Sequence, residues 1–307
     1  MTAPRIVSLL PSATEIVSAL GLGHALVGRS HECDFPLDLP ELPVLTRPRI
    51  DINGTSRAIH CDVGALLEAG LSVYEVDASA LKALDPDFIV TQTQCDVCAV
   101  TPDDLQTALA SFTGRRPEIV SLAPATLSEV WASFDSAASA LDIPARAAPL
   151  RQEIEARIEQ VLARVDGLPR PSVACIEWIE PLMAAGNWIP ELVGLAGGRN
   201  VFGAPGEHSP WLDPQALLDA DPDVVAIFPC GFDRARGEAE TTASQRRAPW
   251  LPPRALRLGR VAVADGHQFF NRPGPRLIES LEILSEMLHP ELKHQHPSAW
   301  SRWPTSE

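Results

Sequence analysis

The chain has 307 residues and a formal net charge of −15, with 25 Lys and Arg residues against 40 Asp and Glu residues. This length allows two domains of ordinary size, and the acidic balance excludes nucleic acid and anionic membrane surfaces as favoured partners. The 6 cysteines are too few for a disulfide framework at this length. No apolar run approaches the ~20 residues that a membrane span needs.

The first residues bear on where the protein works. Before Pro11 they contain only the short apolar stretch of residues 6–10, which is too short for the apolar region of a secretory signal. We therefore expect a cytoplasmic protein whose thiols stay reduced. A periplasmic location is the alternative if the true start lies further upstream.

Short apolar runs alternate with amphipathic helical stretches in the first half of the chain. The sequence predicts strands at 5–10, 25–30, 72–77, 87–92 and 118–123, and helices at 12–23, 78–85 and 126–142. This alternation is typical of a parallel sheet covered by helices. Ser12 is followed three residues later by Glu15, the pattern of a capping box, so we expect Ser12 to be the N-cap of the first helix.

Residues 145–167 have the apolar spacing of one long amphipathic helix. Strand–helix alternation then resumes, and residues 217–230 repeat the order found in 81–94: a helix end, Asp-Pro-Asp and a buried strand. We predict an α/β fold of two Rossmann-like lobes with mainly parallel sheets, joined by one long α-helix. The expected parts are an N-terminal lobe (1–144), the connecting helix (145–167), a C-terminal lobe (168–290) and a tail without regular structure (291–307).

The segments that come after the predicted strands are rich in aromatic, acidic and thiol groups. They include "SHECDFP" (30–36), "TQTQCDVCAV" (91–100) and "GHQFFNRPGPR" (266–276). In open parallel sheets, ligands bind beyond the carboxyl ends of the strands. We therefore expect a ligand in a cleft between the two lobes.

The order of the motifs over both halves resembles a known family. "RIVSLLPSATEIVSALGLGHALVGRSHECDFP" (5–36) is similar to the N-terminal signature of the cobalamin- and iron-siderophore-binding proteins of ABC importers. "AAGNWIPELVGLAGGRNVF" (184–202) looks like the second-lobe signature of that family, and 265–284 looks like its last strand and helix. The resemblance implies a helical-backbone periplasmic-binding-protein fold, a small-molecule metal chelate such as cobalamin as ligand, and an ABC permease as partner.

The candidate ligand-binding residues stand in the strand-end segments: Ser12, Glu32, Gln94, Glu177, Trp178, Trp188, Phe270 and Arg272. Flat aromatic side chains suit a macrocycle. Glu177 beside Trp178 is a carboxylate that is costly to leave without a partner. Arg272 can pair with Glu177 or with an anionic group of the ligand.

Cys95 and Cys98 have the C-x₂-C spacing that suits two thiolates on one metal ion. His31 and Cys33 come after a neighbouring strand and complete a candidate Cys₃His metal site, with Glu32 as an alternative oxygen ligand. The other interpretation is that the three cysteines are small side chains that line a pocket. The cobalamin binders of the family place an aromatic residue in the loop where Glu32 stands here.

No catalytic motif is found: the sequence lacks G-x-S-x-G, G-x-x-x-x-G-K-[ST] and H-E-x-x-H. We therefore predict a non-catalytic protein that binds a cobalamin-like or other metal-chelate ligand. The alternative is a cytoplasmic metal-site protein or enzyme that holds zinc or iron on the Cys/His set.

Overall fold

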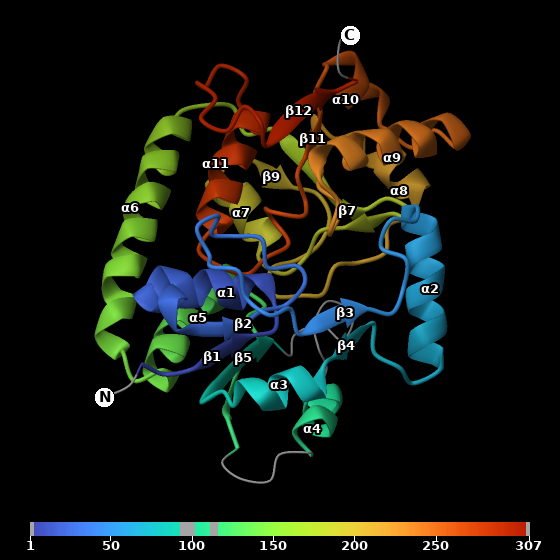
Figure 1. Ribbon diagram of the computed structural model, residues 1–307. Helices are drawn as coiled ribbons and strands as arrows, with labels where there is room; N and C mark the ends of the chain where they lie inside the picture. Colours follow the sequence, from blue (N-terminus) through green and yellow to red (C-terminus); the bar gives the residue numbers. More distant parts are fainter. Residues whose placement is uncertain (1–2, 93–101, 111–115, 305–307) are drawn as a thin grey trace. The chain divides into compact units, whose positions relative to one another are not determined.

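The structure of the chain is a computed structural model that describes residues 3–92, 102–110 and 116–304 (Figure 1). The chain forms two compact units. Unit 1 comprises Met1–Gly54, Ala58–Pro124 and Ser128–Gln152, and unit 2 comprises Thr55–Arg57, Ala125–Leu127 and Glu153–Glu307. The α/β fold class with mainly parallel sheets is confirmed.

Unit 1 contains a parallel sheet of four strands in the order β2-β1-β5-β6. The strands are β1 (Ile6–Ser8), β2 (Leu26–Gly28), β5 (Phe88–Gln92) and β6 (Glu118–Leu122), and β3 (Thr46–Pro48) and β4 (Tyr74–Val76) form a separate antiparallel pair. Its core gathers Val7, Leu9, Leu45, Leu81 and Ile89, all buried. All three residues of β1 are buried, which agrees with the mostly apolar sequence around this strand.

The helices of the first half of the chain are α1 (Pro11–Val17), α2 (Ser56–Glu68), α3 (Ala78–Leu84), α4 (Pro102–Leu109) and α5 (Leu127–Ala140), with a π-helical turn at Ser18–Leu22 and 3₁₀ turns at Gly23–Ala25 and Pro144–Arg146.

The expected capping box at Ser12 is wrong. Leu10 is the N-cap, in an extended conformation and without a side-chain cap, and Ser12 lies inside the first turn. Pro11 explains the difference, because its fixed φ favours the first helical position.

The predicted long helix is α6 (Ala147–Val165), and the chain passes from unit 1 to unit 2 inside it, between Gln152 and Glu153. The lobe limits 1–144 and 168–290 stay a prediction.

Unit 2 is built on a sheet of six strands. Five follow the order β12-β11-β10-β7-β8, and β9 pairs with β7. The strands are β7 (Ser172–Trp178), β8 (Met183–Ala184), β9 (Arg199–Asn200), β10 (Val224–Ile227), β11 (Val261–Ala264) and β12 (Trp300–Trp303). The helices are α7 (Ile189–Leu195), α8 (Pro214–Ala220), α9 (Arg234–Arg247), α10 (Pro253–Arg257) and α11 (Leu277–Leu288).

The tail at 291–307 was expected to lack regular structure, and this expectation is wrong for Trp300–Trp303. These residues form β12, which pairs antiparallel with β11 over Val261–Ala264 (Figure 1). The short strand has no helical or long alternating pattern, so its sequence alone gives little signal. Pairing with the edge of an existing sheet supplies the hydrogen bonds that make it a strand.

Candidate functional site

In unit 1, the end of β1 meets α1 in a buried cluster of hydroxyl and thiol groups. Thr14 Oγ1 lies 2.8 Å from Ser8 Oγ and 2.9 Å from Cys33 Sγ. Ser8 Oγ donates its proton to Leu10 O at 3.0 Å, and the hydroxyl of Thr14 can donate to either Ser8 Oγ or Cys33 Sγ. Burial raises the pKa of Cys33 more than its hydrogen bonds lower it. Cys33 is therefore a protonated, buried thiol.

His31, in the loop after β2, is hydrogen-bonded to the first residue of β3. Its backbone N–H donates to Thr46 Oγ1 at 3.0 Å, and its Nδ1 lies 2.7 Å from the same oxygen. The imidazole also packs against the ring of Tyr74, with centroids 5.3 Å apart. Burial lowers the pKa of His31 more than the charge of Glu32 raises it, so the ring is neutral at neutral pH. Its Nε2 is buried and has no hydrogen-bond partner among the described residues.

Glu32 and Ser12 occupy different environments within unit 1. Glu32 is half-buried and accepts a long hydrogen bond from Tyr74 Oη at 3.4 Å, while its backbone N–H donates to Ser30 Oγ. Ser12 is buried in α1. Of these two side chains, Glu32 is the one with surface available to a ligand.

Gln94, Cys95 and Cys98 lie outside the described residues. The Cys₃His metal site therefore stays a prediction. Within residues 3–92, 102–110 and 116–304, no three His, Cys, Asp or Glu side chains form a group that could hold a metal ion. No helix in those same ranges is long and apolar enough to cross a membrane.

In unit 2, β7 ends at two candidate residues, Glu177 and Trp178, which are both half-buried. The indole N–H of Trp178 donates to Glu180 O at 3.2 Å, and its ring meets the ring of Phe232 edge-on at 5.5 Å. The guanidinium of Arg236 lies 3.6 Å from the centre of the Phe232 ring. The partly exposed ring of Trp178 thus gives the end of β7 an aromatic surface, whereas Phe232 is 1% exposed and lies under Arg236.

Residues 265–276, directly after β11, form a loop that we call the ligand loop, because the sequence predicts ligand-binding residues in it. Phe270 at its centre is fully buried and stacks on Phe228, with ring centres 4.2 Å apart. The indole N–H of Trp188 donates to Phe270 O at 2.8 Å. Phe270 has a φ of 68°, a strained value for a residue with a side chain, which these contacts maintain. Trp188 and Phe270 therefore hold the loop in place.

Arg272 is also in the ligand loop, and its side chain is 7% exposed. One guanidinium nitrogen lies 3.2 Å from His267 Nε2, which accepts the hydrogen bond because arginine has no acceptor. Asn271 Nδ2 donates to Phe228 O and Gly266 O and ties the loop to the end of β10. A Cβ on Gly266 would lie 2.3 Å from Pro229 O, so only glycine allows this close approach.

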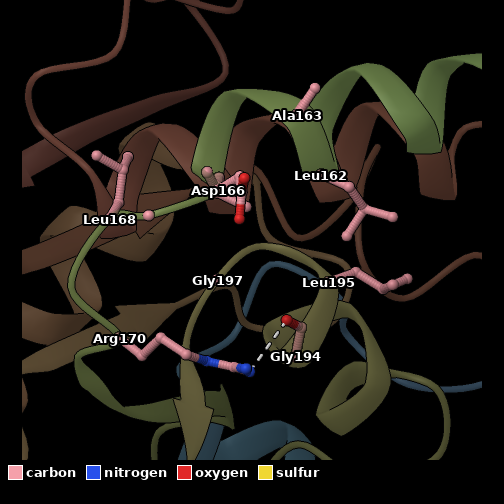
Figure 2. Close-up of a pocket in the computed structure, with 10 residues that line it drawn as sticks. Leu162, Ala163, Asp166, Leu168, Arg170, Gly194, Leu195 and Gly197 are labelled. Carbon is pink, nitrogen blue, oxygen red and sulfur yellow. Dashed lines mark hydrogen bonds between the residues drawn. The ribbon is translucent and has the colours of Figure 1, made fainter.

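Sequence reasoning did not find a groove of about 440 Å³ at the end of α6 (Figure 2). Leu162, Leu168 and Leu195 give it apolar walls. Arg170 donates to Gly194 O and Gly198 O and closes one side of it. Because the loop after a helix carries no motif, the sequence offered no signal for this groove.

The comparisons with known proteins identify the family. Residues 6–245 match the family model described as periplasmic binding protein, so the chain belongs to that family. An uncharacterized ABC transporter substrate-binding lipoprotein, YvrC of Bacillus subtilis (strain 168), is 21% identical over 296 residues, covering 94% of this chain and 80% of the relative. A vitamin B12-binding protein of Yersinia pestis (strain Pestoides F) is 22% identical over 297 residues, covering 93% and 86%.

Solved structures share the fold. A periplasmic heme-binding protein from Pseudomonas aeruginosa superimposes with a TM-score of 0.70 at 24% identity, covering 97% of both chains. The periplasmic vitamin B12-binding protein BtuF of Vibrio cholerae gives a TM-score of 0.64 at 19% identity, covering 93% of this chain and 98% of the other. The resemblance found in the motifs is therefore confirmed over nearly the whole chain.

Proposed function

We propose that this chain is the substrate-binding component of an ABC importer and that it binds a cobalamin-like or other metal-chelate ligand without catalysis. Membership of the periplasmic binding protein family supports the binding role. The vitamin B12-binding and heme-binding relatives support a flat metal chelate as the ligand class. A permease would then be the partner that receives the ligand.

The observation that carries the proposal is the aromatic surface at the end of β7. Trp178 is half-buried, and its indole N–H is already bonded to Glu180 O, so the ring is held in one orientation. A fixed aromatic face suits a broad macrocycle because little conformational entropy is lost on contact. Glu177 beside it supplies a carboxylate for the polar rim of such a ligand.

Trp188 and Phe270 have a supporting part in this proposal. Both side chains are buried in unit 2, and they hold the ligand loop through the bond from Trp188 Nε1 to Phe270 O. In the proposal, Trp178, Glu177, Glu32 and Arg272 contact the ligand. Trp188 and Phe270 keep Arg272 in position.

The test is an absorbance titration of the purified protein with aquocobalamin and, separately, with hemin. We expect a saturable shift with one of them, and Trp178→Ala should weaken that binding about tenfold, since an aromatic contact is worth about 1.5 kcal/mol. Trp131→Ala is the matched control, because Trp131 is also half-buried but packs on Phe134 within α5. Failure of both chelates to give a saturable shift would refute the proposed ligand class.

A second candidate function is a zinc or iron site built on His31 and the cysteines. The buried Nε2 of His31 favours it, because a neutral imidazole nitrogen without a described partner is available as a metal ligand. The protonated Cys33 thiol argues for the pocket-lining interpretation instead. Metal analysis of protein purified without added chelate decides: about one zinc or iron per chain, lost in Cys95→Ser, is the result that this function requires.

The location of the protein depends on which function holds. The lipoprotein and periplasmic relatives support export in the importer proposal. The cytoplasmic location expected from the sequence goes with the metal-site function and stays a prediction.

A further inference from the structure

Residues 289–304, which we call the C-terminal segment, are fastened to the sheet of unit 2 at the point where the ligand loop begins. β12 pairs with β11 from Val261↔Trp303 to Ala264↔Trp300 (Figure 1). One residue further, Asp265 N donates to Ala299 O at 2.9 Å. Asp265 Oδ1 accepts from the backbone N–H groups of His267 and Gln268 and so shapes the first turn of the ligand loop. The position of the segment therefore fixes the start of that loop.

Two glutamates of α11 hold the segment in place. Glu286 is fully buried and accepts from Gln295 N at 2.6 Å, from His296 N at 3.3 Å and from the indole N–H of Trp300 at 3.0 Å. Glu282 accepts from His296 Nε2 at 2.8 Å. These bonds join the segment to α11 at both its backbone and its side chains.

The carboxylate of Glu282 is also bound from α6. Arg157 donates to both of its oxygens, at 2.9 and 2.7 Å, and the carboxylate is thus shared between Arg157 and His296. Burial would raise the pKa of Glu282, but the hydrogen bonds from His296 and Arg157 outweigh it and lower the pKa to about 2. Glu282 therefore stays charged at every pH at which His296 titrates.

The charges that surround His296 come from each element packed against it. Glu279, Glu282 and Glu286 on α11 favour its protonated form. Two cations of α6 face the same region: Arg157 binds Glu282, and Arg164 donates to Gln295 Oε1 and Lys293 O. Within the segment, Lys293 and His294 are the titratable residues nearest to His296 in sequence, and the His294 ring lies 5.0 Å from the ring of Trp300. The hydrogen bond to Glu282 is the largest influence and raises the pKa of His296, more than burial lowers it.

We propose that His296 is a pH-sensitive latch: in its protonated form it holds the C-terminal segment on Glu282 and so positions the ligand loop, and on losing its proton it loosens the segment. The role assigned to the ligand loop rests on the proposed function. The latch itself rests only on contacts within unit 2.

The contacts determine the sign of the pH dependence. Because the pKa of His296 is raised in the folded chain, its stabilisation is complete below the ordinary value of 6.5 and is lost as pH rises through the folded value. The pKa of Glu282 is lowered, so its contribution is present above the ordinary value of 4.5 and is lost only as pH falls toward about 2. The latch is therefore closed in mildly acidic solution and opens toward alkaline pH.

The test is hydrogen exchange of the full chain, without ligand, from about pH 5.5 to about pH 9, with rates corrected for the intrinsic pH dependence of exchange. Protection of residues 265–268 and 296–303 from hydrogen exchange should fall as pH rises. Each unit by which folding raises the pKa of His296 corresponds to a fall of up to about tenfold. His296→Gln keeps a hydrogen-bond donor but does not titrate, so the part of the pH dependence that His296 causes should be absent from this variant. The matched control is His294→Gln in the same segment: it removes the ring contact with Trp300 and can lower protection at every pH, but the pH dependence should remain that of the original chain.

Equal pH profiles in the original chain and in His296→Gln would overturn the latch. If that variant does not fold, the pKa of His296 measured by NMR in the original chain decides, and a value at or below 6.5 overturns the proposal. The exchange experiment contains no chelate. Failure of ligand binding and failure of the latch are therefore distinguishable.

Discussion

The two units repeat one structural device around the Asp-Pro-Asp sequence. In unit 1, Asp85 caps the C-terminus of α3 in the left-handed conformation, and Asp87 Oδ2 accepts from Arg5 N, one residue before β1 begins. In unit 2, Asp221 caps the C-terminus of α8 in the same conformation, and Asp223 Oδ2 accepts from Ser172 N, where β7 begins. Both bonds are 2.8 Å long. The repeat noticed in the sequence is therefore a repeat of structure.

The units differ in the side chains that stand at the ends of their paired strands. After β1, unit 1 has small polar groups, with the hydroxyls of Ser8 and Thr14 and the thiol of Cys33 in mutual contact. After β7 and β11, unit 2 has Trp178 and a loop held by Trp188. A shared scaffold thus carries two kinds of anchor, hydroxyls in unit 1 and aromatic rings in unit 2. The strand pairing determines where the loops begin, but it does not determine which side chains the loops carry.

The largest effect should come from the aromatic anchor of unit 2. Trp188→Ala removes a buried ring and the hydrogen bond to Phe270 O, and we expect it to lower the free energy of unfolding by about 3–5 kcal/mol. Trp188→Phe keeps part of the packing and should lose less, about 1–3 kcal/mol. Denaturant unfolding measures both. Losses of this size would mean that Trp188 mainly stabilises the fold, whereas the sequence predicted that it contacts the ligand.

The hydroxyl anchor of unit 1 should contribute less. Thr14→Val keeps the shape but leaves the groups of Ser8 and Cys33 without their partner, and we expect a loss of about 1–3 kcal/mol in the free energy of unfolding. Thr14→Ser is the control, because it keeps the hydroxyl. A loss in Thr14→Val equal to that in Trp188→Ala would break the proposed ranking of the two anchors.

The scaffold was predictable and the site only in part. The long helix, the strand–helix alternation and the Asp-Pro-Asp repeat are patterns of spacing, which sequence alone reveals. The contact between Trp188 and Phe270 joins residues 82 apart along the chain, and no local pattern indicates whether such a ring faces a ligand or the core. β12 was missed because its pairing with β11, not its own residues, makes it a strand.

The two Asp-Pro-Asp devices should differ modestly. Asp223 also accepts from Ser172 Oγ and forms an ion pair with Arg254. Because hydrogen bonds to charged groups are stronger than neutral ones, Asp223→Asn should lower the free energy of unfolding by about 1 kcal/mol. Asp87→Asn should lower it by less. Burial would raise the pKa of Asp223, but its bonds to Ser172 and the charge of Arg254 outweigh it and lower the pKa.

The pH dependence checks this assignment. With a lowered folded pKa, the stabilisation from Asp223 is present above the ordinary value of 3.8 and is lost as pH falls through the folded value. Stability curves of Asp223→Asn and the original chain should therefore converge in acid. Curves that stay parallel down to about pH 2 would show that the charge of Asp223 is not what stabilises β7.

The smallest effect should come from the antiparallel pair of unit 1, where Arg47 on β3 and Glu75 on β4 form an ion pair at 2.9 Å. The Arg47 side chain is 73% exposed, so water and salt screen the pair, and Arg47→Ala should change the free energy of unfolding by less than about 1 kcal/mol. Arg157→Ala is the contrasting variant, because Arg157 binds the mostly buried Glu282 and its loss leaves that carboxylate without its bidentate partner. Denaturant unfolding at low and high salt compares them. A loss in Arg47→Ala as large as that in Arg157→Ala would mean that burial does not rank the ion pairs of the two units.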